Sequence, residues 1–129
     1  MFAMRLLALR LLIIFNHFFT TLQTSNLGFV TIGNLTNAVS LKKELEDQGA
    51  IFNASSDTEI LMHLIRRSHN PEFIGKVKEA LNTVKGGFAY LLMTEDKLIA
   101  ALDPNGFRPL SIGQMANGAW VVSSETCAF

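Results

Sequence analysis

The most constraining feature of this sequence is a change in the spacing of its apolar residues near position 85. Before it, the segments 37–48, 56–68 and 70–84 carry apolar residues three and four positions apart, the period of an amphipathic helix. After it, short apolar runs are separated by turn sequences such as DPNG and NG, which is typical of neighbouring strands in an antiparallel meander. Helices followed by strands predict an α+β fold.

Individual residues mark where these elements are expected to begin and end. Thr36 or Asn37 suits the cap of the first helix, and Gly49 suits the position just after it. Residues 56–59 have capping-box spacing, and residues 70–71 place a capping Asn before a proline at the first helical position. Strands are expected at 50–52, 86–94, 97–103, 109–115 and 119–124.

Composition narrows the classes of function. The chain has 129 residues, enough for one domain with a sizeable core, and its 11 basic residues balance 11 acidic ones. Zero net charge gives no electrostatic reason to bind nucleic acid or anionic lipid, so a small-molecule or protein partner is expected. The single cysteine, Cys127, excludes an internal disulfide framework and favours a reducing, cytoplasmic setting.

The first 32 residues differ from the rest of the chain. They contain Arg5 and Arg10 but no Asp, Glu or Lys, and they are rich in Phe and Leu. A membrane anchor is one interpretation, but Arg10 and the pair at 16–17 interrupt the apolar run. A secretory signal would need a small-residue cleavage pattern, which the following residues do not offer. Targeting and membrane insertion are therefore disfavoured.

Five ordered blocks within residues 33–129 carry a family resemblance. They are GNLTNAVSLKKELEDQGAIF, SSDTEILMHLIRRS, KGGFAYLLMTEDKL, ALDPNGFRPLSIG and WVVSSETCAF. Together they resemble the glutamine-hydrolysing domain of amidophosphoribosyltransferase. The resemblance implies part of an N-terminal-nucleophile hydrolase fold, an αββα sandwich with an antiparallel sheet. It also implies that the whole protein hydrolyses glutamine and passes the ammonia to phosphoribosyl pyrophosphate, giving phosphoribosylamine for purine biosynthesis.

The same resemblance assigns roles to two residues. The family's oxyanion-hole block, His-Asn-Gly-Asn, corresponds to residues 31–34, so Gly33 matches while Ile32, whose side chain donates no hydrogen bond, does not. Asp57 matches the carboxylate that pairs with the glutamine α-ammonium, and it also suits a first-turn acid that complements the helix dipole. The family's nucleophilic Cys and its Arg-Tyr-Ala-Thr block have no counterpart here, so we expect this chain to be inactive alone.

Cys127 lies in a Glu-Thr-Cys-Ala block that is similar to the iron–sulfur subgroup of the family. In that subgroup this Cys is one of four thiolate ligands to a 4Fe–4S cluster, and a lone thiolate cannot hold one. The alternative is a buried thiol that acts as a small hydrophobe. We expect no cofactor on this chain; the resemblance places Mg²⁺ in the phosphoribosyltransferase domain and implies a homo-oligomer for the full-length family.

Other notable residues are given structural interpretations. Glu59 and His63, four positions apart, are interpreted as an exposed pair rather than metal ligands, because no third ligand is evident. Arg108 is expected to brace its turn against the sheet. The expected core includes Phe73, Phe88, Leu91, Leu102 and Trp120.

A shifted reading frame would account for the composition of residues 1–32. Reading the possible codons two bases later permits the family's Arg-Tyr-Ala-Thr block near the start and His-Asn just before Gly33. We therefore predict that residues 1–32 are an out-of-frame translation and that residues 33–129 are a partial type 2 glutamine amidotransferase domain. The alternatives are another class II amidotransferase domain and a small membrane-anchored binding module.

Overall fold

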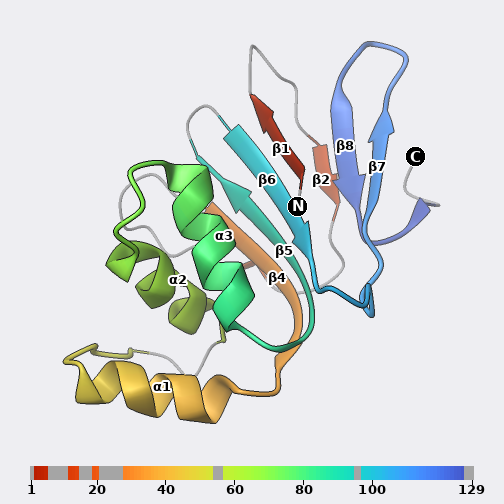
Figure 1. The fold of residues 1–129 in the computed structure, drawn as a ribbon. Coiled ribbons are helices and arrows are strands. Elements are labelled where there is room, and N and C mark those ends of the chain that lie inside the picture. Colours follow the sequence, from red (N-terminus) through yellow and green to blue (C-terminus); the bar gives the residue numbers. More distant parts are fainter. Residues whose placement is uncertain are drawn as a thin grey trace. The chain divides into compact units, whose positions relative to one another are not determined.

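The computed structural model describes residues 2–5, 12–14, 19–20, 28–53, 57–94 and 97–126. The chain separates into a sheet unit, Met1–Gly33 with Phe88–Phe129, and a helical unit, Asn34–Gly87. Along the chain (Figure 1) the elements are β1 (Phe2–Arg5), β2 (Leu12–Ile14), β3 (Phe19–Thr20), β4 (Gly28–Leu35), α1 (Ala38–Asp47), α2 (Asp57–Arg67), α3 (Phe73–Thr83), β5 (Gly86–Met93), β6 (Lys97–Leu102), β7 (Ser111–Gln114) and β8 (Trp120–Ser123).

The sheet unit holds a five-stranded sheet, β1-β6-β5-β4-β3, and a three-stranded sheet, β2-β8-β7. β5 and β6 form the predicted antiparallel hairpin, in which Thr94 N–H donates to Lys97 O at 2.8 Å. β7 and β8 form a second antiparallel hairpin, in which Met115 N–H donates to Ala119 O at 2.8 Å. β2 pairs with β8 in parallel, which the long connection between them permits.

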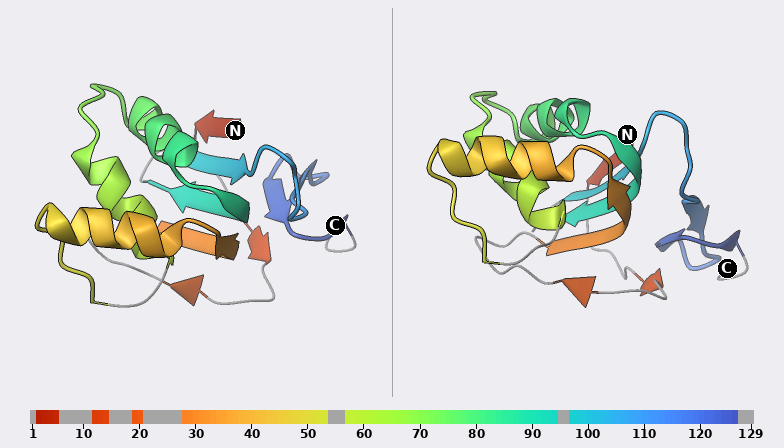
Figure 2. Two further views of the ribbon diagram at one scale, coloured as in Figure 1. Left: turned by 60° about the horizontal axis from the view of Figure 1, so that its bottom comes forward. Right: turned by 90° about the horizontal axis from the view of Figure 1, so that it is seen from below.

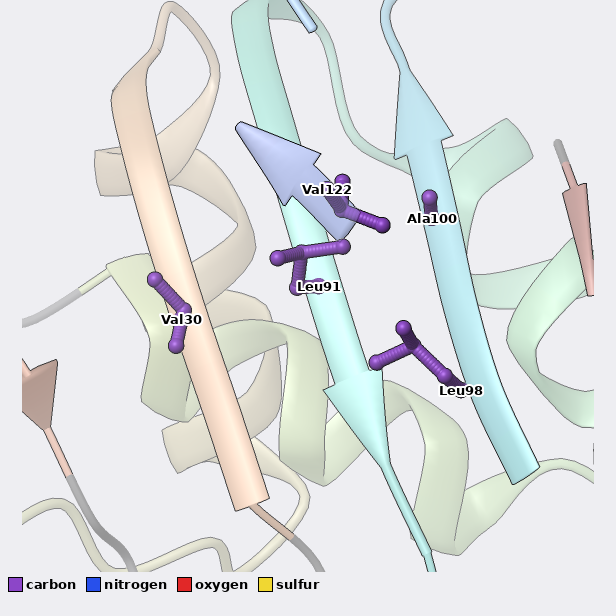
Figure 3. Packing of buried hydrophobic residues seen from close by; sticks show 5 residues of the cluster. All are labelled: Val30, Leu91, Leu98, Ala100 and Val122. Carbon is purple, nitrogen blue, oxygen red and sulfur yellow. The ribbon is translucent and has the colours of Figure 1, made fainter. Parts of the chain in front are cut away.

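A cluster of buried side chains joins the two sheets. Val122 of β8 lies over Leu91 of β5 (Figure 3), and the cluster comprises Val30, Leu91, Leu98, Ala100 and Val122. Burying these apolar side chains contributes roughly 25 cal/mol for each Å² removed from water. The prediction that Phe88 and Leu91 are core residues is confirmed, since each is 2% exposed. The prediction for Leu102 is wrong: it is 40% exposed, because it ends β6 at an exposed turn.

The helical unit is built around α2, which packs against both α1 and α3 (Figure 2). Its buried apolar side chains recur at helical spacing, as predicted, and include Leu41, Leu45, Ile60, Leu61, Ile65, Val77 and Ala80. Among the described residues, no helix is long and apolar enough to cross a membrane.

The helix ends agree with the sequence at two places and differ at a third. Gly49 follows α1 with φ +90°, and α2 begins at Asp57 inside the predicted capping box. α3 begins at Phe73, two residues later than the proline signal indicated. The side chain of Asn70 accepts a hydrogen bond from Glu72 N–H at 3.0 Å, so Asn70 organises the turn ahead of the helix instead of capping it.

Residues 50–52 were expected to form a strand, and this expectation is wrong. Side chains of α2 hold this segment instead: Asn53 N–H donates to Glu59 Oε1 at 2.9 Å, and Nε2 of His63 lies 3.2 Å from Ile51 O. Backbone groups that side chains satisfy need no neighbouring strand. Glu59 is 6% exposed, so its interpretation as part of an exposed pair is also corrected.

Candidate functional site

The candidate site begins where β4 ends, at the stretch that contains the predicted residue Gly33. Gly33 has φ +125°, a backbone conformation that residues with a side chain rarely adopt. It is half-buried, and Asn34 after it is exposed. The resemblance assigned a role to the backbone of this position, and its conformation explains independently why glycine is needed there.

Asp57 binds to the backbone just beyond Gly33. Leu35 N–H donates to Asp57 Oδ2 at 2.8 Å, a partly buried bond between residues 22 positions apart. Among the described residues, no donor contacts Oδ1 of Asp57. Asp57 is also the first residue of α2, where a negative charge complements the helix dipole. The hydrogen-bond partner of Asp57, Leu35, therefore lies two positions after Gly33 in the sequence.

Thr36 and Asn37 are held by the last residue of α3 and by Lys85, two residues after it. Thr36 N–H donates to Lys85 O at 2.7 Å, and Lys85 N–H donates to Asn37 Oδ1 at 2.9 Å. The amide Nδ2 of Asn37 donates to Thr83 O at 3.1 Å. Asn37 occupies the N-cap position of α1, yet its side chain makes no capping bond, because both of its polar atoms are used in this bridge. We call these three bonds the Asn37 bridge.

Gly86 extends the same contact by close backbone packing. A Cβ atom at this position would lie 2.3 Å from Asn34 O and 2.9 Å from Leu35 Cα. Gly86 also has φ +143°, so both its surroundings and its conformation require glycine. Residues 34–37 are thus fixed by α2 through Asp57, by the Asn37 bridge and by Gly86. Such an arrangement can present backbone donors and one carboxylate in a set geometry.

Comparisons with known proteins identify the family of this chain. The profile of a family described as a glutamine amidotransferase domain matches residues 19–129. This chain belongs to that family. The match includes all of residues 33–129 and begins within the apolar first segment. The glutamine amidotransferase domain family therefore accounts for the five sequence blocks.

Relatives within the family are amidophosphoribosyltransferases. Those of Staphylococcus epidermidis are 53% identical over 103 residues, 80% of this chain and 21% of theirs, and that of Bacillus subtilis is 52% identical over 111 residues, 86% of this chain and 23% of its own. The solved structure of the Bacillus subtilis glutamine phosphoribosylpyrophosphate amidotransferase with ADP and GMP matches with TM-score 0.78 and 52% identity, covering 86% of this chain and 24% of that one. The α+β fold is thereby confirmed, and the chain spans about a quarter or less of the length of these relatives.

Sequence reasoning missed one carboxylate of this glutamine amidotransferase domain. Asp103 is 4% exposed, and its side chain accepts hydrogen bonds from Phe88 N–H at 3.2 Å, Asn105 N–H at 2.9 Å and Phe107 N–H at 3.1 Å. Burial raises the pKa of Asp103, but these backbone bonds together outweigh it and hold the pKa below its ordinary value. An Asp at the first position of a DPNG turn is the signal that could have revealed it.

Two further predictions concern charged or metal-binding residues. Arg108 is exposed and, among the described residues, makes no hydrogen bond or ion pair, so the prediction that it braces the turn is wrong; Asp103 does so. Cys127 lies outside the described residues. Within the described part of the chain, no group of three or more His, Cys, Asp and Glu could hold a metal ion. One cysteine in the sequence does not fit the four thiolates of a 4Fe–4S cluster.

Proposed function

We propose that this glutamine amidotransferase domain binds glutamine through Asp57, with Gly33 taking the oxyanion role that the family resemblance gives it, as part of the glutaminase domain of an amidophosphoribosyltransferase. The observation that carries the proposal is the 2.8 Å bond from Leu35 N–H to Asp57 Oδ2, which ties the carboxylate to the strand end that contains Gly33. A binding carboxylate and a fixed backbone stretch are two of the parts that amide hydrolysis needs.

Asp57 is proposed to hold the amino-acid end of the substrate. Its Oδ2 is occupied by Leu35 N–H, whereas its Oδ1 accepts no hydrogen bond from a described residue. The α-ammonium of glutamine would donate to that oxygen, forming a charge-assisted hydrogen bond. Since the backbone bond already fixes the rotamer of the carboxylate, less side-chain entropy is lost when the substrate binds.

Gly33 is proposed to act at the other end of the substrate. When a thiolate attacks the amide carbon, the carbon–sulfur bond forms and the carbonyl electron pair moves to oxygen, which becomes an oxyanion. A fixed backbone N–H stabilises that charge as it develops. The neighbouring position, Ile32, offers no side-chain donor, so the proposed oxyanion site lacks the contribution that the family's Asn would make.

The activity of the whole protein extends the proposal. The complete enzyme would hydrolyse glutamine and deliver ammonia to phosphoribosyl pyrophosphate to give phosphoribosylamine, as a cytoplasmic homo-oligomer. This sequence carries one cysteine, Cys127, far along the chain from the proposed site residues and with no family nucleophile block around it. The 129-residue chain is therefore expected to bind glutamine without hydrolysing it.

We also propose that residues 1–32 are read out of frame and that the native frame resumes at Gly33. The support is that the codons possible for these residues, read in one shifted frame, permit the family's Arg-Tyr-Ala-Thr and His-Asn blocks at their expected places. Sequencing the encoding nucleic acid tests this, and a shifted frame that encodes neither block would refute it.

Titration of the ¹⁵N-labelled chain with L-glutamine tests the proposed site. We expect the backbone amide signals of Gly33, Asn34 and Leu35 to shift on binding. Asp57→Asn keeps an oxygen that can accept from Leu35 N–H but removes the charge, and it should weaken binding roughly 10- to 100-fold, since a hydrogen bond to a charged group contributes about 1.5–3 kcal/mol.

Two controls make this experiment specific. Asp47→Asn removes an equivalent charge from the exposed end of α1 and should leave the affinity unchanged. Glutaramic acid, which is glutamine without its α-amino group, should bind the wild-type chain weakly and should not distinguish it from the Asp57→Asn variant. Equal affinity of the wild type and of Asp57→Asn for glutamine would overturn the proposed role of Asp57. Measurable release of ammonia by the purified chain would overturn the expectation that the chain is inactive.

A further inference from the structure

The side chain of Asn37 is used in a way that its position does not require. An Asn at the N-cap of a helix normally accepts a hydrogen bond from the second or third N–H of that helix. Here Asn37 makes no such bond with α1 and contacts Thr83, the last residue of α3, and Lys85 just after it, 46 and 48 residues away. The folded chain therefore lacks the capping hydrogen bond of Asn37 and has the long-range hydrogen bonds in its place.

We propose that Asn37 is a positioning residue for the glutamine site, which rests on the function proposed above. The Asn37 bridge fastens the start of α1 to residues 83–85, and through Thr36 it fixes the backbone that leads away from Gly33.

The chemistry of the bridge explains why an amide side chain is needed. Oδ1 accepts from Lys85 N–H, and Nδ2 donates to Thr83 O. Thr83 is the last residue of α3, so its carbonyl lacks a partner within the helix. A carboxylate of the same shape would set an oxygen against that carbonyl, and a shorter side chain would reach neither group. The position thus requires a donor and an acceptor side by side.

The bridge acts on the site through consecutive backbone groups. Leu35 N–H is held by Asp57 of α2 and Thr36 N–H by Lys85 O, which lies between α3 and β5, so two successive peptide groups after Gly33 are fixed by different segments. The contact of Gly86 with Asn34 O removes the remaining freedom on that side. When the bridge is lost, the peptide groups of residues 34–36 gain alternative orientations, and the Leu35 N–H that binds Asp57 loses its fixed direction.

The variant Asn37→Asp tests this inference because it changes one side-chain nitrogen to oxygen and keeps the shape. Asn82→Asp is the matched control, since Asn82 is exposed on α3 and its side chain makes no hydrogen bond among the described residues. We expect Asn37→Asp to weaken glutamine binding by up to about tenfold, as expected for losing one or two exposed hydrogen bonds. It should also move the ¹⁵N shift of Gly33 and speed hydrogen exchange at the Thr36 amide, while Asn82→Asp changes none of these.

These measurements separate positioning from stability. A purely structural role would lower the melting temperature of Asn37→Asp but leave the affinity of the folded fraction and the Gly33 shift at their wild-type values, and that result would overturn the inference. If Asn37→Asp does not fold, a scalar coupling across the hydrogen bond from Asn37 Nδ2 to the Thr83 carbonyl carbon is measured in the wild-type chain, and its absence overturns the inference. If the wild type does not bind glutamine, the proposed function fails, and the Gly33 shift and Thr36 exchange still decide the role of Asn37.

Discussion

Gly86→Ala is predicted to be among the most destabilising single-methyl additions in the helical unit. The added Cβ would lie 2.3 Å from Asn34 O and 2.9 Å from Leu35 Cα, both closer than the 3.0 Å that real Cβ atoms observe. Both neighbours are backbone atoms, which cannot rotate away. Gly86 also has φ +143°, where a side chain is strained.

The magnitude follows from these two terms. Backbone strain at a glycine-only conformation costs about 1–3 kcal/mol, and forcing an extra methyl into a packed site costs about 1–3 kcal/mol more. Their sum is a large share of the roughly 5–15 kcal/mol by which domains are stable. Gly49→Ala is the matched control in the same unit, since Gly49 has φ +90° but nothing within 4 Å of its Cβ position. The control variant has the backbone strain of a positive φ but not the steric clash of the added Cβ atom.

Urea unfolding followed by far-ultraviolet circular dichroism measures both variants, because that signal reports α1, α2 and α3. We expect Gly86→Ala to lose about 1–3 kcal/mol more than Gly49→Ala, a difference in midpoint of about 1 M urea. A difference below about 0.5 kcal/mol, the usual range for surface substitutions, would refute the close contact between residues 34–35 and Gly86.

Two further predictions concern carboxylates of the helical unit. Hydrogen bonds from Ser68 and, to a smaller extent, from Asn70 lower the pKa of Glu79. The contribution of Glu79 to stability is therefore full above the unfolded pKa of about 4.3 and is lost as the pH falls through the lower pKa of the folded state. Glu79→Gln should remove this decline in melting temperature at acid pH, and an unchanged decline would contradict the assignment. Glu59→Ala should lower the free energy of unfolding, measured in urea, by about 1–3 kcal/mol. It should also speed hydrogen exchange at the Asn53 amide, which loses its acceptor. Unchanged exchange at that amide would show that Glu59 does not hold this segment.

Much of the helical and strand content follows from local sequence signals. The apolar spacing of α1, α2 and α3 and the turns of the two hairpins are encoded within a few residues, so pattern and turn chemistry suffice. The apolar residues at 50–52 wrongly predicted a strand. The side chains of Glu59 and His63 bind backbone groups of Asn53 and Ile51, so the segment needs no neighbouring strand. The local signal was overridden by tertiary hydrogen bonds.

The residues of the candidate site could be predicted from the sequence, but their hydrogen-bond partners could not. The family resemblance singled out Gly33 and Asp57 by motif. That Asp57 also binds Leu35 N–H, and that Asn37 reaches Thr83, depends on how three helices pack, and partners 22 to 48 positions apart leave no periodic trace in the sequence. A helix-capping signal at Asn37 even points to the wrong partner for its side chain.

The span of the Asn37 bridge has a consequence for the order of events in folding. Its two side-chain bonds, from Asn37 to Thr83 and Lys85, close a segment of 46 to 48 residues, and the entropy cost of closing a loop of that length is not offset by local contacts. The bridge can therefore form only after α1, α2 and α3 have packed, so the backbone beyond Gly33 reaches its final geometry late in folding. By the same reasoning, it is among the first parts of the helical unit to loosen when that unit opens transiently, well before its core unfolds.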